Sequence, residues 1–334
     1  MSNTTLVEVE WEIGPMDIIE NNMNHGEDNW NLPNALVLVP NEIIDNENKN
    51  EGDTVLADWL SEEHGWLVNG ATILDSEITT FDGVKHDKEE LLEKMMDDDF
   101  YYGYLGKQGL SSSTIKVILQ SPKAYISSLV NEDTGSQALT DGKLFHMSIL
   151  EVDKFEALPV VDVSSKASKM YKEAKAEHGE VFTLKEINKA KALAEVFLRN
   201  KEVNEYLNNA DFEVPQMQMI EGLPFRGKAD VLKGNLIIDL KTTANINDFE
   251  YSALKFGYDL QAYLYLQLFP EAEKFIFICI DKTTKDMGIY ECSNSFLESG
   301  RRKLKKGIEE YRHFFQTDLD LEQHTIKKTL NGRI

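Results

Sequence analysis

Two aspartates on one predicted β-hairpin constrain the fold of this chain more than any other feature. Residues 226–241 contain two apolar runs separated by Gly234-Asn235, a two-residue turn signal. A turn there sets a register that places Asp230 directly opposite Asp239, on the same face of the hairpin. Like charges at opposed positions destabilise a sheet. We therefore expect a divalent cation with hard oxygen ligands to bind between the two carboxylates.

The sequence around Asp239 supports this interpretation over the alternative of an exposed hairpin with scattered charges. Asp239 lies within the apolar run Leu-Ile-Ile-Asp-Leu of residues 236–240, which predicts a buried strand. A buried aspartate is rarely left without a partner or a bound ion. Lys241 follows two residues later, on the same face of the strand. Two carboxylates and an ammonium around a metal ion suit a hydrolytic site.

The net charge of −23 is concentrated in the first third of the chain. Residues 1–100 hold 25 acidic residues, four lysines and no arginine, for a net charge of −21. They also hold all four tryptophans, and residues 6–11 and 35–39 have strand patterns, which a disordered acidic tail would lack. Residues 45–53 are predicted as a loop. We expect an acidic α+β domain over residues 1–105 and a second domain over residues 106–334.

Cysteine and apolar content indicate the compartment. Cys279 and Cys292 are too few for a disulfide framework, a four-cysteine zinc site or an iron–sulfur cluster. No apolar run approaches the ~20 residues that span a bilayer, and the first residues lack the pattern of a signal peptide. These observations predict a cytoplasmic protein without a membrane partner.

The second part of the chain alternates between helical and strand patterns. A cluster of N-cap residues begins a helix at Ser111, and Pro122 interrupts it. Further helices are predicted at 137–152, at 165–209 with a break near 178–179, at 248–268 and at 294–316. Strands are predicted at 213–220, 225–232, 236–242, 274–280 and 288–292. This order predicts an α/β or α+β fold with a mixed sheet.

His146 is a further candidate for the hydrolytic site. It lies on the helix of residues 137–152, and Gly142 precedes it on the same helical face. A small residue there lets another backbone or a substrate strand approach the imidazole. A lone helical histidine is more often structural. Beside the aspartate hairpin, however, an imidazole is a plausible third ligand or water-orienting group.

Polar residues near the hairpin form a second set of candidates. Gln261 and Tyr265 are four residues apart on one helix, where they form either a solvated side or a contact with phosphate. Arg226 and Lys228 precede Asp230, and the predicted register pairs Lys228 with Lys241. The basic run of residues 301–306 is either a solvated helix face or a contact with a nucleic-acid backbone.

The order of these motifs resembles the PD-(D/E)XK nuclease superfamily. Within it, the chain is most similar to the exonuclease VIII (RecE-type) branch, which is related to the nuclease domain of RecB and common in phages and prophages. The resemblance covers about residues 110–315, and residues 1–100 resemble no known family. The motifs are Gly142-x3-His146, Arg226-Gly-Lys-Ala-Asp230, Ile238-Asp239-Leu-Lys241-Thr-Thr and Tyr258-Asp-Leu-Gln261-Ala-Tyr-Leu-Tyr265.

The resemblance implies a restriction-endonuclease-like core, in which helices flank a central mixed sheet, and it implies a role for each candidate residue. Mg²⁺ or Mn²⁺ would be bound by Asp230, Asp239, the carbonyl of Leu240 and His146. Lys241 would position or activate the attacking water. Gln261 and Tyr265 would orient the phosphodiester. For Arg226 and Lys228 the prediction comes from their position beside Asp230, which would draw them to the acidic centre or to a phosphate of bound DNA.

The activity implied by the resemblance is that of a metal-dependent exodeoxyribonuclease. It would resect linear double-stranded DNA from 5′ to 3′ for recombination, leave a single strand for an annealing protein, and assemble as a ring of identical chains. One alternative is a single-strand or structure-specific endonuclease of the same fold. Another is a DNA-mimicking or regulatory interaction protein that acts through the acidic N-terminal domain, because strong acidity repels DNA.

Overall fold

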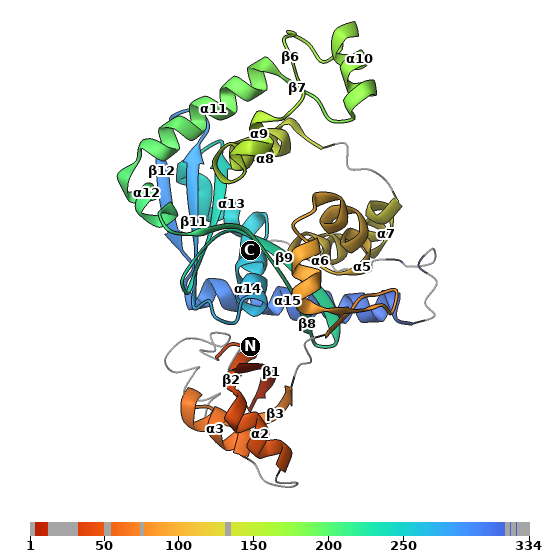
Figure 1. The fold of residues 1–334 in the computed structure, drawn as a ribbon, viewed down its shortest axis with the longest axis vertical. Coiled ribbons are helices and arrows are strands. Elements are labelled where there is room, and N and C mark those ends of the chain that lie inside the picture. Colours follow the sequence, from red (N-terminus) through yellow and green to blue (C-terminus); the bar gives the residue numbers. More distant parts are fainter. Residues whose placement is uncertain are drawn as a thin grey trace, which may run out of the picture.

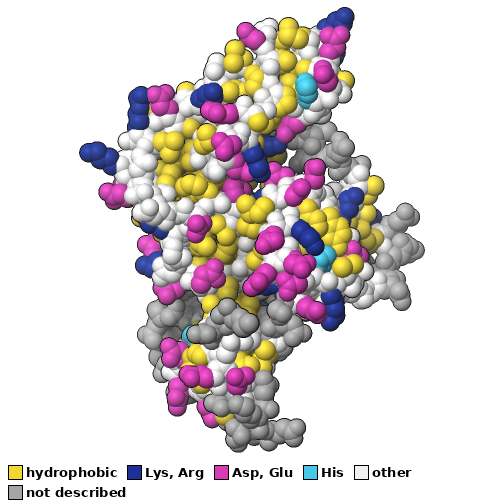
Figure 2. Space-filling view, viewed as in Figure 1, with side chains coloured by type: hydrophobic (Ala, Val, Ile, Leu, Met, Phe, Trp, Pro, Cys, Tyr) yellow, Lys and Arg dark blue, Asp and Glu magenta, His cyan; other side chains and the backbone are white. Residues whose placement is uncertain are grey.

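The computed structural model describes residues 4–12, 33–49, 55–73, 77–130, 135–317, 321 and 325 (Figure 1). The first unit is a three-stranded antiparallel sheet in the order β2-β1-β3, with two helices packed on it. Figure 2 shows acidic side chains on its surface. Its elements are β1 (Thr4–Trp11), β2 (Leu36–Pro40), α2 (Asn41–Lys49), α3 (Val55–His64) and β3 (Val68–Ile73).

The two strands predicted in this unit are confirmed, but the predicted loop at residues 45–53 is wrong where it can be compared. Residues 45–49 belong to α2, and residues 50–53 lie outside the described ranges. Ile44 near the start of α2 is buried in the core of the unit. Packing of this apolar turn holds the polar residues that follow in a helix, although their composition is typical of a loop.

The second unit is built on a five-stranded mixed sheet in the order β12-β11-β10-β9-β8, which confirms the predicted fold class. Only β10 and β11 are parallel among the neighbouring pairs. The strands are β8 (Asp211–Ile220), β9 (Leu223–Lys233), β10 (Leu236–Thr243), β11 (Lys274–Asp281) and β12 (Met287–Glu291).

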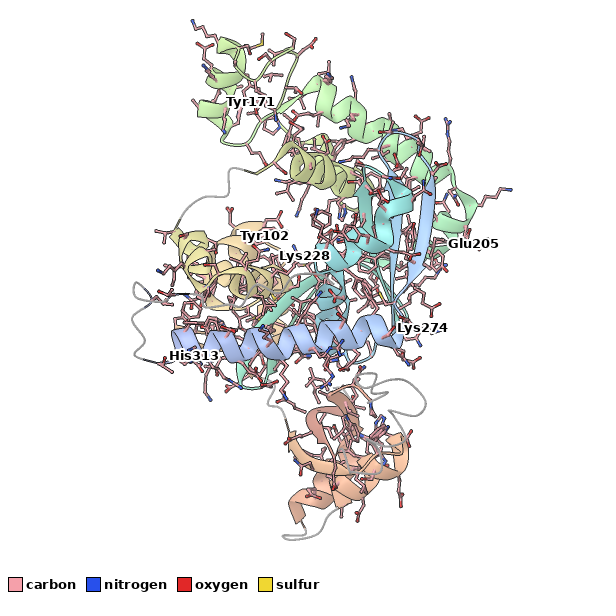
Figure 3. All side chains as sticks on the ribbon, turned by 180° about the vertical axis from the view of Figure 1, so that it is seen from behind. Tyr102, Tyr171, Glu205, Lys228, Lys274 and His313 are labelled. Carbon is pink, nitrogen blue, oxygen red and sulfur yellow. The ribbon has the colours of Figure 1, made fainter. Side chains whose placement is uncertain are left out.

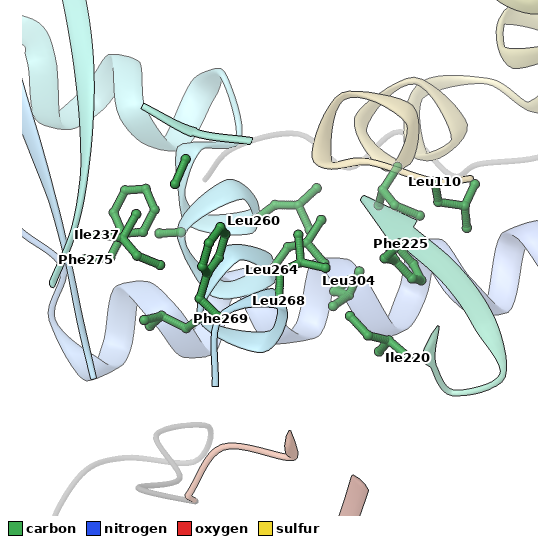
Figure 4. Packing of buried hydrophobic residues seen from close by; sticks show 14 of the residues in the cluster. Leu110, Ile220, Phe225, Ile237, Leu260, Leu264, Leu268, Phe269, Phe275 and Leu304 are labelled. Atoms are coloured by element: carbon green, nitrogen blue, oxygen red, sulfur yellow. The ribbon is translucent and has the colours of Figure 1, made fainter. Parts of the chain in front are cut away.

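Helices cover both faces of this sheet (Figure 1). One face packs on α6 (Ser112–Gln120), α13 (Phe249–Lys255), α14 (Tyr258–Leu268) and α15 (Asn294–Phe315), around a large apolar core (Figure 4). The other face packs on α8 (Gln137–Leu150), α11 (Leu184–Arg199) and α12 (Lys201–Leu207). The remaining elements are α7 (Pro122–Val130), α9 (Val152–Glu156), β6 (Val160–Val161), α10 (Lys169–His178), β7 (Phe182–Thr183) and the 3-10 turn η2 (Ile246–Asp248). Among the residues that the structure describes, no helix is both long and apolar enough to cross a membrane.

The hairpin turn at Gly234-Asn235 forms as predicted. Leu236 pairs with Lys233, and the ladder continues to the pair Ile238–Val231. The ladder ends there, so Asp230 and Asp239 lie just beyond the last pair. The predicted pairing of Lys228 with Lys241 is wrong, because the ladder with β10 ends before these residues, while the other edge of β9 stays paired with β8. The two strands therefore begin to separate at the two aspartates.

A glycine divides the predicted helix of residues 248–268. Gly257 has a φ of +67° and separates α13 from α14. A Cβ atom at this position would lie 2.8 Å from the side chain of Lys116, so the packing of α6 also requires a glycine. The predicted break near residue 178 is confirmed, since α10 ends at His178 and Gly179 follows with a φ of +77°.

Residues 77–108 pack against the large sheet. They form β4 (Glu77–Thr79), β5 (Lys85–Asp87), α4 (Lys88–Lys94), the π-helix η1 (Asp99–Tyr104) and α5 (Leu105–Gln108). Their apolar core includes Leu91, Met95 and Tyr101, and it is completed by Met217 of β8. A domain that ended at residue 105 would divide this core. The packing favours a division between β3 and β4.

Candidate active site

The Asp230 carboxylate is fixed from two sides at the point where β9 and β10 separate. Its Oδ2 atom accepts a hydrogen bond of 2.8 Å from the backbone N–H of Leu240. The same oxygen lies 3.2 Å from Nδ1 of His146, on α8. Gly142 of α8 faces Thr242 of β10, but a Cβ atom there would lie 4.0 Å from the Thr242 hydroxyl, an ordinary contact that does not require glycine. Both partners engage one oxygen of Asp230.

Asp239 is buried, with 2% of its surface exposed, and both of its oxygens have polar neighbours. Oδ1 accepts a hydrogen bond of 2.5 Å from Nε2 of Gln261, on α14. Oδ2 forms an ion pair with the Lys241 ammonium, but among the described residues no donor forms a hydrogen bond of ordinary geometry with it. The Lys241 ammonium also lies 4.9 Å from the centre of the Tyr258 ring.

Burial and charge shift the titration of this cluster in opposite directions. Burial raises the pKa of Asp239, and the charge of Asp230 adds to the shift. Burial would also raise the pKa of Asp230, but the neighbouring His146 outweighs it and lowers the pKa. For His146 the carboxylate of Asp230 outweighs burial, so its pKa is raised. The two carboxylates likewise outweigh burial at Lys241 and raise its pKa.

The structure therefore brings six of the nine predicted site residues together, and it places the other three elsewhere. The six are Asp230, Asp239, Leu240, Lys241, His146 and Gln261. The Tyr265 hydroxyl donates to the Lys228 carbonyl at 3.1 Å and so fastens α14 to the backbone of β9. The side chains of Arg226 and Lys228 are buried beneath η1, where Arg226 donates to the carbonyl of Leu105 at 3.0 Å. These three residues do not contact the carboxylates.

Residues 111–321 match the family described as a PDDEXK-like domain of unknown function (DUF3799). The chain belongs to this family. The match covers more than half of the chain and all elements from α6 to α15. The PDDEXK-like domain thus contains both strands of the hairpin and the helices that carry His146 and Gln261.

One solved structure shows a similar fold. A structure from Eubacterium rectale named "Putative exonuclease" is 18% identical, with a TM-score of 0.51, over 70% of this chain and 95% of that chain. A phage related exonuclease from Haemophilus somnus 129PT is 16% identical over 47% of this chain and 90% of that chain, but its TM-score of 0.27 is too low to support an argument. A search of curated proteins finds no match.

Two charged residues of the PDDEXK-like domain lie near the site but belong to none of the sequence motifs. Glu213 of β8 has a φ of +51°, and burial together with the charge of Asp230 raises its pKa to about 8. Lys116 of α6 has a pKa lowered to about 8, chiefly by burial and then by the charge of Lys241. Lys116 could have been noticed as the one cation in the apolar run of residues 115–119. Glu213 begins the strand predicted at residues 213–220, and from that position the sequence indicates that it could face the site.

The basic run of residues 301–306 is partly used within the fold. Arg301 forms two hydrogen bonds with Glu298, at 2.6 and 2.7 Å. Lys303 forms an ion pair of 2.6 Å with Asp259, which is fully buried on α14. The Lys303 pair therefore links α15 to α14, whereas the Arg301 pair lies within α15, and both roles are structural.

Proposed function

We propose that this protein is a metal-dependent exodeoxyribonuclease that hydrolyses phosphodiester bonds in linear double-stranded DNA. One observation carries the proposal. Asp230, Asp239 and Lys241 converge at the opening of the β9–β10 ladder in a PDDEXK-like domain, and each is held by a specific partner. Buried carboxylates with shifted pKa values are typical of functional sites. The exonuclease name of the Eubacterium rectale structure supports the choice of reaction.

The residues present fit a divalent cation. Asp239 offers a buried oxygen that accepts no hydrogen bond of ordinary geometry, and Asp230 has a second oxygen beyond the one held by His146 and Leu240. Within the described ranges, no three His, Cys, Asp or Glu side chains are arranged to hold an ion by themselves. A site with only two carboxylates is sufficient for Mg²⁺, because this ion keeps several waters and binds one or two carboxylates together with substrate phosphates.

Each residue of the cluster has a role in this proposal. Asp230 and Asp239, with the Leu240 carbonyl, would hold Mg²⁺ or Mn²⁺, which lowers the pKa of a bound water and neutralises charge on the phosphate. His146 would orient Asp230, as its Nδ1 atom does here. Lys241, with its raised pKa, is an ammonium that would donate a hydrogen bond to the attacking water or a phosphate oxygen. Gln261 would hold Asp239 in position.

The finer parts of the proposal are 5′-to-3′ polarity, a role in recombination with an annealing protein, and a ring-shaped homo-oligomer. Placement of the first unit is compatible with DNA binding despite its acidity. The backbone N–H of Glu221, in the β8–β9 turn, donates to the Glu8 side chain at 2.8 Å. That turn is about 25–30 Å along β9 from Asp230. The described part of the acidic first unit therefore does not cover the carboxylates.

A nuclease assay tests the proposal. Linear duplexes labelled at the 5′ or 3′ end would be incubated with Mg²⁺ and with a chelator, beside a circular single strand that reports endonuclease activity. We expect end-dependent degradation of the duplex that requires the cation. Asp239→Asn and Lys241→Gln should each reduce the rate by at least about 100-fold.

The matched control is Asp211→Asn, which removes an exposed carboxylate from β8 of the same sheet. It should retain full activity. Activity that survives both site substitutions would exclude this catalytic centre, and cleavage of the circle would favour the endonuclease.

A further inference from the structure

Lys228 is the cation next to Asp230 on β9, and it is covered. The two side chains share one face of the strand and are about 7 Å apart along it. Only 6% of the Lys228 side chain is exposed, and its ammonium lies 3.3 Å from Oδ1 of Asp98. A cation beside the catalytic carboxylates is where a phosphate of bound DNA would be expected, yet a carboxylate of the same chain holds this position.

Asp98 also binds a second cation from a different element. Its Oδ2 atom lies 3.0 Å from the ammonium of Lys154, on α9. Lys154 in turn forms an ion pair of 2.5 Å with Glu151, at the end of α8. The neighbouring cations outweigh burial and lower the pKa of Asp98. One carboxylate thus bridges two lysines from opposite sides, with the geometry that a phosphate would have between them.

The π-helix η1, which follows Asp98 directly, covers the same cations. The Tyr101 ring lies 4.7 Å from the Lys228 ammonium and 4.4 Å from the Arg226 guanidinium. The Tyr102 ring lies 6.0 Å from the Lys228 ammonium, and both residues are labelled in Figure 3. Tyr102 is 66% exposed. π-Helical turns are rare and are often found at functional sites. The apolar core of residues 78–105 with Met217 already fastens this segment to β8 without the ion pairs.

We propose that Lys228 and Lys154 form a subsite for a DNA phosphate, and that Asp98 occupies this subsite as an internal phosphate mimic in the free protein. Binding of DNA displaces the Asp98 carboxylate, which frees Lys228 and leaves Lys154 paired with Glu151 alone. The inference rests on the proposed function and deepens it. It assigns Lys154 to the DNA-binding surface and gives the acidic run of residues 97–99 a local regulatory role.

The experiment compares Asp98→Asn with Asp99→Asn in the full-length protein. Each variant removes one negative charge, Asp99→Asn at the first residue of η1 and Asp98→Asn at the residue before it. Within the described ranges, Asp98 forms two ion pairs and the Asp99 carboxylate forms none. Binding of a blunt duplex would be measured with a chelator present, so that no cleavage occurs, over a series of salt concentrations. Wild-type cleavage with Mg²⁺ is measured in parallel.

We expect Asp98→Asn to bind about fivefold more tightly than wild type, because two competing ion pairs are lost. Its plot of log affinity against log salt should steepen by about 1 to 2, as one or two more phosphate contacts form. Asp99→Asn should change affinity by less than about twofold and leave the slope unchanged. Adding Lys154→Gln to Asp98→Asn should reverse part of the gain.

Two results would overturn the proposal. If Asp98 only fastens η1 to the sheet, Asp98→Asn would lower the melting temperature and leave affinity and salt slope equal to those of Asp99→Asn. In that case wild-type cleavage would persist and the proposed nuclease function would stand. If no variant binds DNA and the wild type does not cleave it, both proposals fall together.

Discussion

His146 and Asp230 meet between α8 and β9, with Nδ1 of the imidazole 3.2 Å from Oδ2 of the carboxylate. The backbone N–H of Leu240 donates to the same oxygen. Two donors on one oxygen fix the carboxylate plane and leave Oδ1 for another ligand. The imidazole therefore orients the carboxylate instead of adding an independent ligand through Nδ1.

The first prediction concerns this contact. His146→Gln should lower the rate of duplex cleavage by about 10- to 100-fold, the usual cost of removing a residue that orients a metal-binding carboxylate. Its circular dichroism should match that of wild type. His178→Gln, on exposed α10, is the control and should be fully active. If His146→Gln is as active as wild type in a steady-state assay, His146 has no role in the site.

The second prediction separates two properties of Gln261. Gln261→Leu removes the hydrogen bond to Asp239, and we expect about a tenfold loss of activity. Gln261→Glu places a second carboxylate beside the first and raises the pKa of Asp239 further, so the loss should reach about 100-fold. When cleavage rates are measured across pH, the activity of Gln261→Glu should rise at a higher pH than that of wild type. A profile identical to that of wild type would contradict the argument.

Local sequence signals were sufficient wherever the structure depends on neighbouring residues. Gly234-Asn235 set the hairpin register, and Ser111 caps α6 through a 3.2 Å hydrogen bond from the N–H of Thr114. The convergence of Asp239 and Lys241 on one face followed from the strand period. The sequence motif also led to Gln261, although its contact is a carboxylate and the expected one was a phosphate.

The remaining differences arise from contacts between distant segments. Nothing near Lys228 indicates that the β9–β10 ladder ends at the pair Ile238–Val231, and this early end removes the predicted pair with Lys241. The packing of residues 78–105 on β8 depends on Met217, more than 100 positions away. Glu213 lies close enough to Asp230 for the two charges to interact, and its backbone has a positive φ that no local pattern predicts. Such features are decided by tertiary packing, which overrides local patterns.

The third prediction uses the buried capping box of α11. Glu186 accepts hydrogen bonds from Gln137 at 2.8 Å and from the Thr183 backbone at 2.9 Å, and it pairs with Lys166 at 2.7 Å. Burial opposes the charged form, but these partners outweigh it and lower the pKa of Glu186 to about 2. Since the folded pKa lies below the unfolded value, the carboxylate stabilises the fold above about pH 4.5. This stabilisation is lost as the pH falls from there towards about 2.

Glu186→Gln should therefore cost about 1–2 kcal/mol of unfolding free energy at neutral pH, after solvent screening is allowed for, and progressively less below about pH 4.5. Urea denaturation at a series of pH values measures the difference. Glu195→Gln is the control on the same helix, because its pair with Arg199 is exposed. Its cost should stay within about 0.5 kcal/mol. A pH-independent cost for Glu186→Gln would show that the carboxylate charge is not responsible.

The fourth prediction concerns the close crossing of α14 and α15, which holds Gln261 over the site. A Cβ atom added at Gly300 would lie 2.1 Å from the Asp259 carbonyl oxygen and 2.8 Å from Cβ of Tyr263. A backbone oxygen cannot rotate away, so Gly300→Ala must push the helices apart. We expect a loss of about 2–3 kcal/mol in unfolding free energy. Gly106→Ala, whose new atom would lie 3.8 Å from Arg226, should change it by less than about 0.5 kcal/mol.

The same variant tests how the site depends on the fold. If α14 shifts, the hydrogen bond from Gln261 to Asp239 weakens, so Gly300→Ala should also lose activity at temperatures where it remains folded. The loss should not exceed that of Gln261→Leu, because both act through one contact, and combining the two substitutions should add little. Losses that multiply in the double variant would show that α15 supports the site through a route other than Gln261.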